Sequence, residues 1–98
     1  MNVTLHNSDC RMISVPPVDV VITDPPYPNR ADHFTEDIPA AIEFLTTYSC
    51  NRWFVFWDEM EVPPVPLPLV ARHIWHRSNP IRPDNYEAIY EFNKDGIR

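Results

Sequence analysis

Residues 18–27 read VDVVITDPPY, a run of apolar and β-branched side chains that ends in an acid, two prolines and a tyrosine. The apolar residues show no helical spacing, which is typical of a buried parallel strand. Pro25 and Pro26 lack an N–H and force the residues before them into extended backbone, so the strand should end abruptly at Asp24. Ligands of open α/β sheets bind outside the carboxyl ends of the strands. This placement makes Asp24 and Tyr27 the first candidates for a functional site.

Length and composition predict one small globular domain, residues 1–98, with a modest core. The hydrophobic content of 44% and the charged content of 22% are ordinary for a folded chain, so disorder is not expected. The unusual counts are twelve prolines and a single glycine, Gly96. One glycine excludes a glycine-rich loop around a phosphate or a cofactor.

Charge and cysteine usage narrow the class of protein further. The net charge of −6 and the pI near 5.0 argue against a stand-alone DNA binder, which needs clustered Lys and Arg against phosphates. Cys10 and Cys50 lie far apart without a CxxC motif, and the sequence shows no secretory or membrane-spanning segment. We expect a cytoplasmic protein whose cysteines are packing residues.

The rest of the chain predicts an α/β sheet of about five strands with one main helix. Apolar side chains at Ile38, Ala41, Ile42 and Leu45 recur with helical spacing, which predicts a core-facing helix that begins near residue 35 and ends near Tyr48. Strands are expected at 2–6, 18–23, 52–57, 70–77 and 86–92.

A proline-rich segment at 62–68 cannot be helical, because each interior proline removes a hydrogen bond and clashes with the preceding turn. We expect an extended crossing that serves as a connector, with a ligand for an aromatic-lined groove as the alternative. No metal site is expected. Asp32 and His33 lack a second pair at ligand spacing, and His73 and His76 face opposite sides of their strand.

The motif Asp24-Pro25-Pro26-Tyr27 resembles the catalytic motif of the amino-methyltransferases, which transfer a methyl group from S-adenosylmethionine to an exocyclic amine of a DNA base. In that family the Asp form usually marks adenine N6 enzymes. The resemblance implies that the Asp24 carboxylate and the Pro25 carbonyl each accept an amino hydrogen, which aims the nitrogen lone pair at the methyl group. Tyr27 would stack on a base flipped out of the duplex.

Further residues are assigned through the same resemblance. Family members of the permuted class open with a strand ending in Gly-Asp-Cys, which implies cofactor contacts for Asp9 and Cys10, although Asp9 can equally cap a helical turn. The segment from Trp75 to Pro80 is similar to the family pattern Trp-x-Lys-x-Asn-Pro, with Arg77 where lysine is usual. Asn79 and Pro80 would line the base pocket, and Arg77 would bind a phosphate or form a structural ion pair.

The missing glycine-rich turn implies only the catalytic half of the family's Rossmann-like sheet, which leaves an unpaired edge on the strand at 18–23. Three outcomes are open. Another polypeptide supplies the missing part, the opening strand pairs directly with residues 18–23, or two copies join as a homodimer.

The leading hypothesis is therefore the catalytic portion of a DNA adenine N6-methyltransferase that uses S-adenosylmethionine and DNA, from a phage or restriction–modification setting. By itself the chain would have weak or no activity. The alternative is a non-catalytic interaction protein that keeps the half-fold and uses its acidic surface or its proline-rich segment to bind a protein partner.

Overall fold

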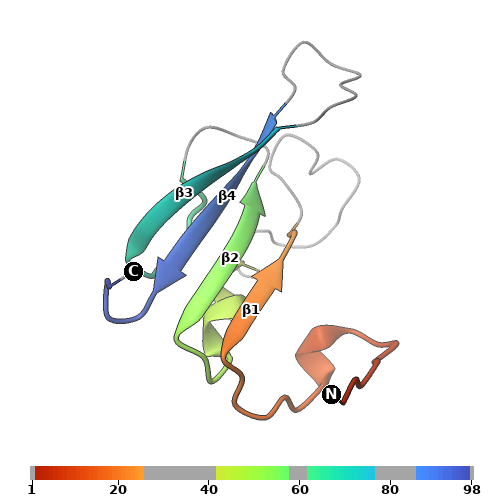
Figure 1. Ribbon diagram of the computed structural model, residues 1–98. Helices are drawn as coiled ribbons and strands as arrows, with labels where there is room; N and C mark the ends of the chain where they lie inside the picture. The colour runs from red at the N-terminus through yellow and green to blue at the C-terminus, as the bar shows by residue number, and fades with distance from the viewer. Residues whose placement is uncertain (1, 26–41, 58–61, 77–85, 98) are drawn as a thin grey trace.

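The computed structural model describes residues 2–25, 42–57, 62–76 and 86–97. Its centre is a four-stranded mixed sheet with the order β1-β2-β4-β3 (Figure 1). The strands are β1 (Val20–Thr23), β2 (Arg52–Trp57), β3 (Leu69–His76) and β4 (Tyr86–Asn93). Strands β1 and β2 are parallel, whereas β4 runs antiparallel to both of its neighbours. The predicted α/β character is present in this coarse form, as a mixed sheet with little helix.

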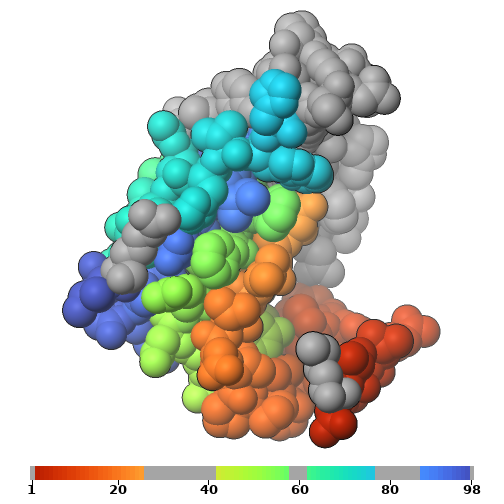
Figure 2. Space-filling model, viewed as in Figure 1, coloured from red at the N-terminus to blue at the C-terminus, as the bar shows by residue number. Residues whose placement is uncertain are grey.

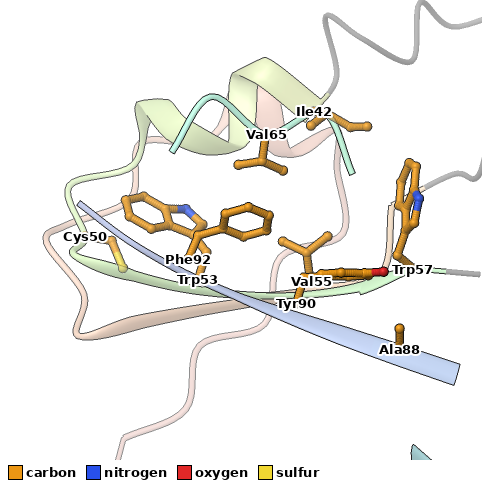
Figure 3. Close-up of a cluster of buried hydrophobic side chains, with 9 residues drawn as sticks. All are labelled: Ile42, Cys50, Trp53, Val55, Trp57, Val65, Ala88, Tyr90 and Phe92. Carbon is orange, nitrogen blue, oxygen red and sulfur yellow. The ribbon is translucent and has the colours of Figure 1, made fainter. Parts of the chain in front are cut away.

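The core lies on one face of this sheet and follows directly from the alternation in β2. Trp53, Val55 and Trp57 are buried, and the residues between them are only partly so. The antiparallel register sets Trp53 opposite Phe92 and Val55 opposite Tyr90, so large side chains of the two central strands pack side by side. Figure 3 shows them pointing to the same side of the sheet.

Two segments cover this face. A helical turn at 42–44 and the 3-10 helix η3 (Leu45–Thr47) place Ile42 over the core, and the chain leaves the helix at Tyr48 as predicted. The indole N–H of Trp53 donates to the Leu45 carbonyl at 2.8 Å, which joins the helix to β2. Of the predicted apolar stripe, Ile38 and Ala41 lie outside the described residues.

The proline-rich crossing is the second cover. The described part, 62–68, contains no helix, which confirms the prediction from its prolines. Pro63 and Val65 are buried against the core, and the amide of Val65 donates to the Pro63 carbonyl at 2.7 Å in a tight turn. The segment therefore serves as packing for the sheet as well as a connection.

The other side of the sheet, termed the open face, has neither cover, and Figure 2 shows it from the front. Its members follow from the register: Val20, Ile22, Arg52, Phe54, Phe56, Ala71, His73, Trp75, Glu87, Ile89, Glu91 and Asn93. Several of its apolar side chains reach solvent, with Ile22 67% and Trp75 49% exposed.

Two predictions about the first quarter of the chain are wrong. Residues 2–6 form no strand, and Val3 and Leu5 are exposed; no strand among the described residues lies beside them, and alternation alone does not hold an unpaired strand. Four strands are therefore present among the described residues where about five were expected. The strand of residues 18–23 begins at Val20 and lies at the edge of the sheet, and its residues alternate between exposed and partly buried, so it is not buried on both faces.

The one-sided core gives a prediction about stability. Replacing Trp53 with alanine should lower the free energy of unfolding by about 3–5 kcal/mol, because it removes a fully buried indole and its hydrogen bond. The matched change Trp75→Ala on the open face should cost only about 1 kcal/mol. Urea unfolding followed by circular dichroism measures both, and equal losses would contradict a core confined to one face.

Candidate functional site

Asp24 follows the last residue of β1, at the end of the sheet where three strands finish. Strands β1 and β2 are parallel, and β3 runs in the same direction because two antiparallel pairings separate it from β2. Their carboxyl ends therefore lie at one rim, where ligands of α/β sheets commonly bind. The prediction that placed Asp24 at such a rim is consistent with this geometry.

A hollow of about 270 Å³ lies at this rim and is termed the Asp24 hollow. Its lining consists of Ile22, Thr23, Asp24, Phe56 and Trp75. The rings of Phe56 and Trp75 meet edge to face with centroids 6.0 Å apart, so two aromatic side chains from different strands form one wall. A carboxylate beside an aromatic wall can bind a flat ring that carries a hydrogen-bond donor.

The remaining residues of the motif are only partly described. Asp24 is exposed and takes part in an interaction within the chain, and the next residue, Pro25, is buried. Pro26 and Tyr27 lie outside the described residues, as do Arg77, Asn79 and Pro80. In sequence, the first pair follows the end of β1 and the other three follow the end of β3.

Asp9 acts as a helix cap. Its carboxylate accepts hydrogen bonds from the Arg11 amide at 2.9 Å and from the Arg11 Nε at 3.0 Å, and it caps the 3-10 helix η1 (Cys10–Met12). This is the alternative that the sequence left open for Asp9. The Arg11 guanidinium and amide lower the pKa of Asp9 from its ordinary value of 3.8 to about 2.

Cys10 lines a second and larger hollow of about 370 Å³, termed the edge hollow. It lies along β1, and its lining is Cys10, Val15, Val18, Val20, Val21, Ile22, Thr23, Leu45 and Tyr48. Burial, followed by the nearby Cys10 thiol, raises the pKa of Tyr48. The edge hollow and the Asp24 hollow share Ile22 and Thr23, so they lie on either side of the same short strand.

A polar cluster on the open face was missed from the sequence. Glu91 of β4 is 3% exposed, and its two carboxylate oxygens lie 2.9 Å from His73 Nε2 and 3.6 Å from Arg52 Nε. Each partner comes from a different neighbouring strand, so the cluster joins β2, β4 and β3 across a face that no described helix or loop covers.

Phe56 and Trp75 were also not predicted as site residues. Their signal was period-two alternation, which sets both on the face away from the core together with Phe54 and His73. The pairing of β2 and β3 through β4 was not visible in the sequence, and that pairing brings the two rings together.

No group of three or more His, Cys, Asp or Glu side chains in the described segments is arranged to hold a metal ion. Within the same segments, no helix has the length and apolar character needed to cross a membrane.

The capped turn generates a prediction about pH. The folded pKa of Asp9 lies below its unfolded value, so its contribution to stability is complete above the unfolded pKa and is lost as the pH falls through about 2. NMR titration of the Asp9 carboxyl should give a midpoint near 2, and Arg11→Ala should return it toward 3.8. A midpoint unchanged by Arg11→Ala would contradict the assignment.

Known proteins add no further evidence about this site. No protein-family model, no curated protein and no solved structure matches the chain. The resemblance to the amino-methyltransferases therefore rests on its motif residues alone.

Proposed function

We propose that this chain is the catalytic portion of a DNA adenine N6-methyltransferase with a partial Rossmann-like sheet. In this proposal Asp24 activates the exocyclic amine of a flipped adenine, and Pro25, Pro26 and Tyr27 complete the motif around the base. The observation that carries the proposal is the position of Asp24 at the carboxyl end of a parallel strand, in a hollow with two aromatic side chains.

The chemistry of adenine explains why such a hollow is suitable. The amine at N6 is a poor nucleophile, because its lone pair is delocalised into the ring. A carboxylate that accepts an amino hydrogen favours the pyramidal nitrogen whose lone pair can attack a methyl group. The Asp24 carboxylate is the acceptor, and the Pro25 carbonyl is the second acceptor in the proposal.

The size and walls of the Asp24 hollow also support a single base. Small-molecule sites range upward from about 300 Å³, so a hollow of about 270 Å³ suits one ring system better than a whole nucleotide. Phe56 and Trp75 offer aromatic surface, and stacking on such surface is the usual way in which a protein holds a base that has left the duplex.

The cofactor does not fit the described residues by themselves. S-adenosylmethionine would supply the methyl group, but Asp9, which the resemblance assigns to it, is already bound by Arg11. The edge hollow that contains Cys10 is lined mainly by aliphatic side chains, and the sole glycine, Gly96, lies in the turn after β4. In the proposal, a complementing segment therefore binds the cofactor. Asn79 and Pro80 line the base pocket, and Arg77 binds a phosphate.

A second candidate function is a non-catalytic interaction protein. The exposure of Ile22 and Trp75 on the open face favours this function. The net charge of −6 also favours it, because an acidic chain binds DNA poorly by itself. In this case the Asp24 hollow would receive a side chain of a partner protein.

Methyl transfer tests the leading proposal. The weak transfer expected of the chain alone is measured with radiolabelled S-adenosylmethionine and an adenine-containing duplex over long incubation. Asp24→Ala should reduce it on the order of 10²–10³-fold, because the amine loses its acceptor. Asp19→Ala removes an exposed acid at the other end of β1 and is the matched control, which should keep wild-type transfer. Measurable transfer that is equal in wild type and Asp24→Ala would reject the enzymatic role.

Binding of adenosine tests the hollow without requiring turnover. Trp53 and Trp57 are buried, so adenosine stacked in the Asp24 hollow should quench mainly the half-exposed Trp75. Fluorescence titration should give quenching that Trp75→Phe abolishes and Asp24→Asn weakens about tenfold, because a charged acceptor is replaced by a neutral one. Quenching that survives Trp75→Phe would place the nucleoside elsewhere.

A further inference from the structure

The two edges of the sheet are built differently. At the β3 edge the strand follows Pro68, is interrupted by an irregularity between Leu69 and Ala71, and carries the exposed Arg72. Proline, bulges and charge are the usual devices that keep an edge from pairing with another chain. At the β1 edge, Asp19 and Asp24-Pro25 flank the strand, but Val20–Thr23 itself contains no charge, proline or irregularity, and among the described residues no strand pairs with its outer side.

The edge hollow lies along this unprotected edge. Its lining includes consecutive residues of β1, which point to alternate faces of the sheet, together with Leu45 and Tyr48 of the segment that covers the core face. The hollow therefore lies beside the strand and extends toward the core face. Its far wall comes from Cys10 and Val15 of the N-terminal segment, which lies on the β1 side of the sheet in Figure 1. The result is an apolar groove beside a row of backbone groups.

We propose that this groove accepts an extended, β-branched segment of another polypeptide, which adds a fifth strand next to β1. Backbone hydrogen bonds to β1 supply the affinity, and alternate side chains of the added strand fill the edge hollow. The exposed Val20 and Ile22 extend the contact on the open face.

Charge identifies the kind of segment. The exposed Asp19 directly precedes β1, and the chain as a whole carries −6. Lysine or arginine beside the apolar residues of the added strand would therefore be attracted, and acidic residues repelled. A second copy of this chain is a less favourable occupant of the groove. Antiparallel pairing centred on β1 would set Asp19 of each copy opposite Asp24 of the other and bring together two chains of −6.

The inference stands apart from the proposed methyl transfer, because it depends on the edge and its groove and on no reaction. The experiment uses the full chain and a fluorescein-labelled peptide of alternating valine and threonine flanked by lysines. The same peptide flanked by glutamates is the charge control. Anisotropy should show binding of the lysine peptide, and about tenfold weaker binding of the glutamate peptide.

Variants locate the binding surface. Ile22→Lys places a charge on the β1 edge and should weaken binding of the lysine peptide about tenfold. The matched change Ile74→Lys on the β3 edge should leave the affinity for this peptide unchanged. Cys10→Phe fills the edge hollow without a change of charge and should also weaken binding, whereas Cys10→Ser should not.

The opposite results overturn the inference. They are absence of peptide binding, equal affinity for both peptides, equal effects of Ile22→Lys and Ile74→Lys, or no effect of Cys10→Phe. Light scattering provides a further test. If the chain alone forms a dimer and Ile22→Lys abolishes that dimer, a second copy occupies the groove and the inference is wrong. Methyl-transfer activity has no bearing on any of these readouts.

Discussion

The packing of β2 against β4 on one face of the sheet is the contact on which the rest of the structure depends. Trp53 and Phe92 lie side by side there, as do Val55 and Tyr90, and all four are fully buried. Strands β2 and β4 are the central pair of the sheet. The outer strands β1 and β3 pair with them, and the covering segments pack on them. The apolar area of these large side chains is the main source of folding free energy in a domain this small.

Because the core lies on one face of the sheet, polar and aromatic contacts stabilise the open face. The buried Glu91 carboxylate joins side chains from both neighbouring strands, and aromatic contacts such as Phe56 with Trp75 add to it. The Asp24 hollow opens over this second face, so the candidate site and the core share strands but not side chains. Residues at the hollow can therefore serve binding without being needed for the core, which fits the separation of scaffold and site common in α/β proteins.

The extent to which the sequence predicted the fold differs from one element to the next. The β-branched and aromatic run at 52–57 predicted the bounds of β2, whereas its alternating burial came from the structure, because five consecutive apolar residues do not mark which face is buried. The prolines at 62–68 excluded a helix for a covalent reason that no tertiary contact overrides. Residues 2–6 alternate in sequence but form no strand with any described residue, and the apolar run of β1 suggested burial on both faces where the strand is half exposed.

The sequence by itself determined the local features: where β2 begins and ends, where the backbone cannot be helical, and that Asp24 terminates a strand. These follow from side-chain period and from the geometry of proline, which act over a few residues. Only the tertiary structure decided that residues 2–6 do not pair with β1, that Asp9 caps a turn bound by Arg11, and that Phe56 and Trp75 meet beside Asp24. Strand order and register join residues far apart in the chain, and no local pattern encodes which strands become neighbours.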